Sequence, residues 1–243
     1  MPKVLIADNV SDVVCEIFDT NNIEYEKKVG LSEDELSAEI KGYDGLLIRS
    51  AVTVTKKIIE SSDTLKVIGR PGVGVDNVDL QASSEKNIVV MNTPLGNVQA
   101  TAELTFGIIH SLMRKIHIAN SSMHNKKWEK KKLIGNELLG KNIAIIGFGN
   151  IGKKVADFAQ AYGMNIIVVS ETASSGDVDY LNAKVMKFDD MLSEADIITF
   201  HNKLSEKSKY IINSESLKQM KKNSIMINGA RGGIVNEADM KES

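Results

Sequence analysis

The residues best suited to chemistry form a glycine-rich segment, Gly147-Phe148-Gly149-Asn150-Ile151-Gly152, between an apolar run and a helical pattern. In such a strand, turn and helix, Gly147 permits a tight turn and Gly149 leaves room for a pyrophosphate beside the backbone. Gly152 lets the helix pack closely against the strand. The free N–H groups at the start of the helix favour an anion. The segment therefore predicts a dinucleotide-binding turn, with a purely structural glycine turn as the alternative.

Composition limits the class of protein that carries this turn. The chain has 243 residues, 42% of them hydrophobic, and a formal net charge of −2, so no strong basic field favours nucleic acid or an anionic membrane. Cys15 is the only cysteine, which excludes an intrachain disulfide and fits a reducing compartment. No apolar run approaches the roughly 20 residues of a membrane span, and no signal peptide precedes the first strand pattern. We expect a soluble cytoplasmic α/β protein.

Short apolar strand patterns alternate with helical patterns along the whole chain, which implies parallel sheets covered on both faces. We expect a first domain over residues 1–97 and a second over 98–243, joined near Thr93–Asn97 by a long helix from about Gln99 to His124. The expected strands are Val4–Asp8, Glu24–Val29, Gly45–Arg49, Lys66–Arg70 and Ile88–Asn92, then Ile143–Ile146, Ile166–Val169, Ala183–Met186, Ile197–His201 and Ser224–Asn228.

Several segments together resemble the D-isomer-specific 2-hydroxyacid dehydrogenases. These segments are Arg70–Asp79, Met91–Pro94, Gly96-Asn97, Ala102–Leu104, Trp128-Glu129, Leu139–Lys141, Gly147–Gly152 and Asn228–Glu237. The resemblance implies two doubly wound parallel-sheet domains: a flavodoxin-like substrate domain and a Rossmann domain that binds NAD. It also implies oxidation of a D-2-hydroxy acid to the 2-oxo acid, with phosphorylated 3-phosphoglycerate as the expected substrate. A homodimer formed through the long helix is expected as well.

Within this resemblance, Arg231 is the candidate catalytic residue. A 2-hydroxy acid carries a carboxylate beside the reacting oxygen, and a guanidinium can bind the carboxylate while it polarises the carbonyl of the oxidised product. Arg231 follows the last expected strand, and ligands bind at the carboxyl ends of parallel strands. The alternative is a surface arginine in a glycine-rich turn.

The resemblance also assigns a cofactor site. The acidic residue that usually holds the adenosine ribose is replaced by Ser170, with Glu171 beside it, and no arginine follows to bind a 2′-phosphate, so NAD is favoured over NADP. His201 is interpreted as a hydrogen-bonded loop residue, distinct from the family's proton carrier. The expected cofactor-binding residues are Val73, Gly147, Gly149, Asn150, Ile151, Gly152, Ser170, Glu171, His201, Asn202, Gly229, Ala230 and Arg231.

On the substrate side, Arg49 could bind a phosphate, or it could be an exposed arginine at the end of a strand. Lys130 lies in the basic segment Lys126–Lys132, which is either a solvated loop or a source of a cation for a neighbouring subunit's substrate. The expected substrate-binding residues are Arg49, Ser50, Gly74, Asn97 and Lys130. No metal is expected, since His110, His117 and His124 would lie about 10 Å apart in succession along one helix.

The end of the chain departs from the family pattern. The second domain shows five strand patterns where the usual dinucleotide fold has six, and no segment matches the family's acid–base histidine or its glutamate. We expect an incomplete second domain and little turnover from this polypeptide, because losing a general acid–base group costs a factor of about 10²–10⁴. A non-catalytic NAD-binding or interaction protein, including a corepressor-type protein, is the alternative function.

Overall fold

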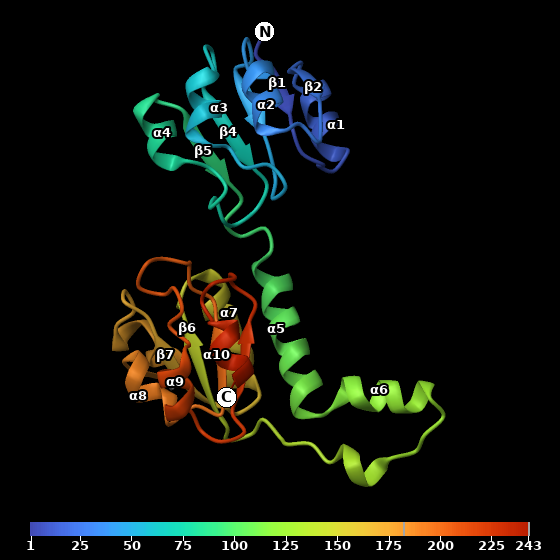
Figure 1. Ribbon diagram of the computed structural model, residues 1–243, viewed down its shortest axis with the longest axis vertical. Helices are drawn as coiled ribbons and strands as arrows, with labels where there is room; N and C mark the ends of the chain where they lie inside the picture. Colours follow the sequence, from blue (N-terminus) through green and yellow to red (C-terminus); the bar gives the residue numbers. More distant parts are fainter. Residues whose placement is uncertain (182, 243) are drawn as a thin grey trace. The chain divides into compact units, whose positions relative to one another are not determined.

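The computed structural model describes residues 1–181 and 183–242. The chain forms two compact units, Met1–Asn97 and Val98–Ser243, each with its own sheet and core (Figure 1). In the part of the chain that the structure describes, no helix is both long enough and apolar enough to span a membrane.

The first unit is a five-stranded parallel sheet in the order β2-β1-β3-β4-β5. This is the strand order of the flavodoxin-like fold, so the fold class predicted for this half is confirmed. Its strands are β1 (Lys3–Ile6), β2 (Glu24–Lys27), β3 (Gly45–Leu47), β4 (Val67–Arg70) and β5 (Val89–Asn92). Its helices are α1 (Val13–Thr20), α2 (Glu33–Glu39), α3 (Lys56–Ser61) and α4 (Leu80–Glu85).

The second unit is a parallel sheet in the order β10-β9-β6-β7-β8, which is the Rossmann arrangement of five strands counted from β6. Its strands are β6 (Asn142–Ile146), β7 (Asn165–Val169), β8 (Ala183–Val185), β9 (Ile197–Phe200) and β10 (Ile225–Asn228). Its α-helices are α5 (Val98–Met113), α6 (Ile116–His124), α7 (Asn150–Ala161), α8 (Phe188–Leu192), α9 (Ser214–Gln219) and α10 (Glu237–Glu242). Short 3₁₀ helices cover Lys130–Leu133, Ser175–Asp177 and Asp179–Leu181.

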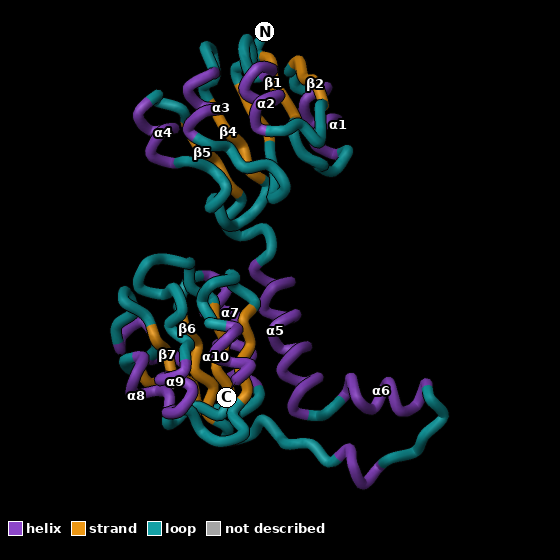
Figure 2. The backbone as a smooth tube through the Cα atoms, in the orientation of Figure 1, coloured by secondary structure: helices purple, strands orange, loops and turns teal. Residues whose placement is uncertain are grey.

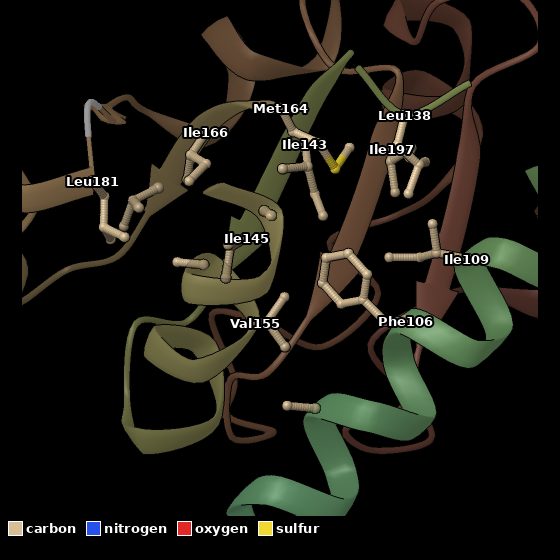
Figure 3. Close-up of a cluster of buried hydrophobic side chains, with 14 of the residues drawn as sticks. Phe106, Ile109, Leu138, Ile143, Ile145, Val155, Met164, Ile166, Leu181 and Ile197 are labelled. Carbon is tan, nitrogen blue, oxygen red and sulfur yellow. The ribbon is translucent and has the colours of Figure 1, made fainter. Parts of the chain in front are cut away.

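Alternate side chains of the second sheet enter two different cores, as expected for a strand whose successive residues point to opposite faces. Ile143 and Ile145 pack with Phe106 and Ile109 of α5 and with Val155 of α7, as Figure 3 shows. Ala144 and Ile146, which alternate with them along β6, belong to a second cluster on the other face. This cluster includes residues of α8 and of the segment after β10. Because both faces are covered, the central strands β6, β7 and β9 are mostly apolar, and ligands are expected at the carboxyl edge of the sheet.

The single helix predicted from Gln99 to His124 is wrong. The chain forms α5 and α6 with a break between them at Lys115, whose φ is +54° (Figure 2). The segment after the 3₁₀ helix Lys130–Leu133 packs at this break: the Asn136 N–H donates to the Met113 carbonyl at 2.8 Å, and Gly135 lies against that same carbonyl. The seven-residue histidine spacing therefore does not run along one continuous helix. The helix α4 was also not predicted.

Candidate cofactor and substrate loops

The predicted dinucleotide turn joins β6 to α7, and its three glycines lie in different surroundings. Gly147 has φ +91°, and a Cβ there would lie 2.6 Å from the backbone nitrogen of Asn202. At Gly152 a Cβ would collide with the Gly147 carbonyl oxygen. At Gly149, the N-cap of α7, no atom lies within 4 Å of the position a Cβ would take. The turn thus combines two close backbone contacts with one open position at the start of a helix, which suits a phosphate.

The other expected cofactor residues of the second unit follow the carboxyl ends of its strands. Asn150 and Ile151 begin α7, Ser170 and Glu171 follow β7, and His201 and Asn202 follow β9. The residues that follow β10 are Gly229, Ala230 and Arg231. Since β7, β6, β9 and β10 are adjacent and parallel, these loops share one edge of the sheet.

The loop after β10 is shaped by Asn228. Its Nδ2 donates to the Arg231 carbonyl at 2.8 Å, and its Oδ1 accepts from the Ala230 N–H at 3.2 Å. The exposed Arg231 side chain donates from Nη1 to the Ala230 carbonyl at 2.8 Å. Beside this loop is a pocket of about 430 Å³, lined by Met226, Asn228, Gly229, Ala230, Arg231, Gly232, Val235, Glu237 and Met240.

The loop after β9 presents His201 and Asn202 next to the glycine turn. Burial lowers the pKa of His201 to about 4, so the imidazole is neutral at physiological pH, and its Nε2 lies 3.0 Å from the Thr199 hydroxyl. This agrees with the interpretation of His201 as a hydrogen-bonded loop histidine. The Asn202 Nδ2 donates to the Lys203 carbonyl, whereas its Oδ1 is buried with no hydrogen-bond partner among the described residues. A buried acceptor without a donor is costly, and a bound ligand can supply the donor.

The loop after β7 uses its two polar residues differently. The Ser170 hydroxyl accepts from the N–H groups of Thr172 and Ala173 at 3.3 and 3.2 Å, so it closes its own turn. The exposed Glu171 carboxylate instead forms an ion pair with Lys207, with 2.8 Å between Oε1 and Nζ. Of the two, Glu171 is therefore the side chain available to a ribose hydroxyl.

In the first unit, the buried Asp8 organises the loop that follows β3. Its Oδ2 accepts from the N–H groups of Arg49 and Ala51, both at 3.0 Å. Burial by itself raises the pKa of Asp8, but the hydrogen bonds from backbone N–H groups, of which that of Ala51 acts most strongly, lower it below its ordinary value. Asp8 thus remains ionised and fixes the backbone on which Arg49 and Ser50 lie.

A second arginine lies beside Arg49. Arg70, at the end of β4, donates from Nε to the Arg49 carbonyl at 3.4 Å, and Asn77 donates to the same carbonyl at 2.7 Å. Two guanidinium groups are thus held at the carboxyl ends of adjacent parallel strands. The expected residues Val73 and Gly74 follow Arg70 in the next loop, where the Val73 carbonyl accepts from the Asn92 side chain.

Two further expected substrate residues, Asn97 and Lys130, belong to other segments of the chain. Asn97 is exposed and ends the first unit. Lys130 is exposed and begins a 3₁₀ helix, so the basic segment is only partly the irregular loop that its composition predicts. No group of three or more histidine, cysteine or acidic side chains suited to a metal was found in residues 1–181 and 183–242.

Sequence reasoning gave no role in the site to Asp8, Arg70, Lys207 or Asn228, although Arg70 and Asn228 begin two of the segments that carry the resemblance. Asp8 and Asn228 lie at or just past strand ends, a position that could have singled them out. Lys207 gave no such signal, because it lies 36 residues from Glu171 in sequence.

Known proteins resemble this chain along nearly its whole length. The family profile described as "D-isomer specific 2-hydroxyacid dehydrogenase, NAD binding domain" matches residues 106–243. Proteins named D-3-phosphoglycerate dehydrogenase from Archaeoglobus fulgidus and Homo sapiens are 37% and 40% identical, over 99% and 97% of this chain. The chain spans less than half the length of these relatives, 46% and 44%.

Solved structures show the same fold. The TT0316 protein from Thermus thermophilus matches with a TM-score of 0.89 and 28% identity, covering 99% of this chain and 77% of that protein. A D-lactate dehydrogenase from Aquifex aeolicus, solved with NAD and lactic acid, matches with a TM-score of 0.88 and 22% identity, covering 98% and 72%.

Proposed function

Because the chain belongs to the D-isomer-specific 2-hydroxyacid dehydrogenase family, we propose that it serves the NAD-dependent oxidation of 3-phosphoglycerate to 3-phosphohydroxypyruvate. The name shared by relatives that are 37–40% identical favours this substrate. Residues 1–97 would form the substrate domain and residues 98–243 the NAD-binding domain.

The observation that carries the proposal is the turn from β6 to α7. The open position at Gly149 lies at the N-terminus of a 12-residue helix, where free N–H groups and the helix dipole favour the pyrophosphate. Asn150 and Ile151 would supply part of this N–H array. The orphaned Oδ1 of Asn202, beside Gly147, would accept a hydrogen bond from the cofactor. When bound, NAD accepts the hydride from the substrate carbon.

Arg231 would bind and orient the substrate carboxylate. Its guanidinium offers paired N–H donors to two carboxylate oxygens, and a donor beside the reacting oxygen stabilises the carbonyl that forms as the hydride leaves. The bonds that Asn228 makes within the loop hold the backbone on which this side chain lies. Gly229 and Ala230 would contact the cofactor beside it.

Arg49 and Arg70 would bind the phosphate of the substrate. An arginine binds phosphate bidentately, and two guanidiniums offset the double charge better than one. The backbone bonds from Asp8 and Asn77 keep the Arg49 loop in place, so little ordering is required when the phosphate binds. Ser50, Val73, Gly74 and Asn97 would complete the first unit's contacts, and Lys130 would reach the substrate of a neighbouring subunit.

Ligand binding by calorimetry tests the proposal without requiring turnover. We expect the chain to bind NADH, and the NADH-bound chain to bind 3-phosphoglycerate more tightly than D-glycerate, which lacks the phosphate. Arg49→Met and Arg70→Met should each weaken 3-phosphoglycerate binding by roughly tenfold or more, the loss of a charge-assisted hydrogen bond. Both should leave NADH binding unchanged.

Arg114→Met is the control, since Arg114 is an exposed arginine at the end of α5, outside the proposed loops. It should leave the affinity for 3-phosphoglycerate unchanged. Failure to bind NADH would refute the cofactor assignment. Equal affinity for 3-phosphoglycerate and D-glycerate would refute the phosphate assignment alone.

A further inference from the structure

The loop after β9 reaches the loop after β7 through one charged contact. The Lys207 Nζ donates to the Glu171 Oε1 at 2.8 Å. Glu171 is the acidic residue of the β7 loop, where Rossmann folds hold the adenosine ribose. The Ser170 hydroxyl already accepts from the N–H groups of Thr172 and Ala173, and it carries no negative charge with which to distinguish a ribose hydroxyl from a phosphate.

The segment that carries Lys207 is internally ordered. The Ser205 N–H donates to the Ser208 hydroxyl at 2.8 Å, and this hydroxyl also lies 2.9 Å from the Lys203 carbonyl. The Tyr210 N–H donates to the Gly233 carbonyl at 2.8 Å, which attaches the end of the segment to the loop after β10. The backbone on either side of Lys207 is therefore fixed, and its ammonium meets Glu171 from a defined position.

We propose that Lys207 is a specificity-determining residue of the cofactor site, whose positive charge beside Glu171 sets how strongly NADPH is disfavoured relative to NADH. The proposal rests on the NAD binding proposed above. The acidic residue comes one position later than usual, and Lys207 contacts it from the neighbouring loop.

The charges determine the direction of the effect. A ribose 2′-hydroxyl donates to the Glu171 carboxylate, whereas a 2′-phosphate is repelled by it. Lys207 offsets this repulsion, because its positive charge lies against the same carboxylate. Removing Lys207 should therefore weaken NADPH binding more than NADH binding. Removing the charge of Glu171 should do the opposite, since Lys207 is then available to the phosphate.

The effect is expected to be small, because the side chains of Lys207 and Glu171 are 82% and 76% exposed. An exposed pair of this kind changes an equilibrium by roughly twofold to fivefold, and less at high salt.

The test compares dissociation constants for NADH and NADPH at low salt. Lys207→Met should raise the ratio of the NADPH to the NADH constant by roughly twofold to fivefold. Glu171→Gln should lower that ratio. The double variant, which combines Lys207→Met with Glu171→Gln, should lose the gain in NADPH binding that Glu171→Gln alone produces. Lys209→Met is the matched control, because it removes the same charge from the same loop, where Lys209 lies over the Tyr210 ring.

An unchanged ratio in Lys207→Met, or an equal change in Lys209→Met, would overturn the role of Lys207 while leaving the proposed function intact. If the wild-type chain binds no NADH, both proposals fail together. A change in the ratio of the two dissociation constants that depends on salt and is confined to the Glu171 and Lys207 variants supports the inference.

Discussion

Two glycines of the dinucleotide turn, Gly152 and Gly149, have different surroundings. Gly152 has no room for a side chain because the Gly147 carbonyl lies against it, whereas the space beside Gly149 is open. Packing within the protein therefore requires a glycine at position 152, whereas a glycine at position 149 leaves room for the phosphate of a bound cofactor. Substitution by alanine tests both, because it adds one methyl group and little else.

We expect Gly152→Ala to lower the free energy of unfolding by about 1–3 kcal/mol, since its Cβ would meet backbone that cannot rotate away. Gly149→Ala should leave stability close to that of the wild type and weaken NADH binding by roughly tenfold or more, as it obstructs the phosphate. Urea denaturation and NADH titration measure the two effects.

Gly107→Ala serves as the control, because Gly107 lies within α5 and also has open space around it. Its substitution should stabilise the helix slightly and leave NADH affinity unchanged. Equal effects of Gly149→Ala and Gly107→Ala on NADH binding would contradict the role of the turn.

Among the elements, the edge strand β2 takes part in a chain of ion pairs. Glu26 lies between Lys28 and Lys3, at 2.8 and 2.5 Å, and Lys28 also contacts Glu39 of α2 at 2.6 Å. The hydrogen bonds from Lys28 and Lys3 lower the pKa of Glu26 to about 2. The strand that closes this edge of the first sheet is therefore sensitive to pH.

Glu26→Gln should lower the Tm of the first unit at pH 7. The pKa of Glu26 is lower in the folded state than its ordinary value of 4.5, so its contribution is complete above about pH 4.5 and is lost as the pH falls toward 2. The difference in Tm between wild type and variant should shrink over that range, as measured by circular dichroism. Glu24→Gln, on the same strand, should change Tm less, and a difference that did not vary with pH would contradict this account.

At the scale of the whole molecule, α5 and α6 expose several large apolar side chains. Leu112 and Ile116, on either side of the break, are 40% and 51% exposed. The other exposed apolar side chains of these helices are Leu104, Ile108, Ile118 and Met123. Such a surface marks an interaction site, and we propose that it pairs two copies of the chain in a homodimer.

Sedimentation velocity should detect a dimer of the wild-type chain and a monomer of the double variant Leu112→Asp with Ile116→Asp, because a charge cannot be buried unpaired in an apolar interface. Ile17→Asp is the control, since Ile17 is 52% exposed on α1, outside this surface. A wild-type monomer, or a dimer that survives the double variant, would refute this interface.

Much of the fold and part of the candidate site could be predicted from sequence. The alternation of apolar strands with helices predicted two parallel sheets, and the structure has them. The turn from Gly147 to Gly152 was found because its three glycines lie close together in sequence, so the signal is local. The position of Arg231 at a strand end followed from the parallel sheet, since all its carboxyl ends share one edge, whereas most other site residues came from the family resemblance.

The amino-acid sequence by itself therefore determined the class of fold, the dinucleotide turn and the family, because strand period, glycine spacing and motif order are properties of neighbouring residues. Only the tertiary structure decided where α5 ends, that Arg70 lies beside Arg49 and that Lys207 holds Glu171. Each of these depends on residues about 20 or more apart in sequence, brought together by the packing of loops. A local pattern carries no information on which distant group will supply that contact.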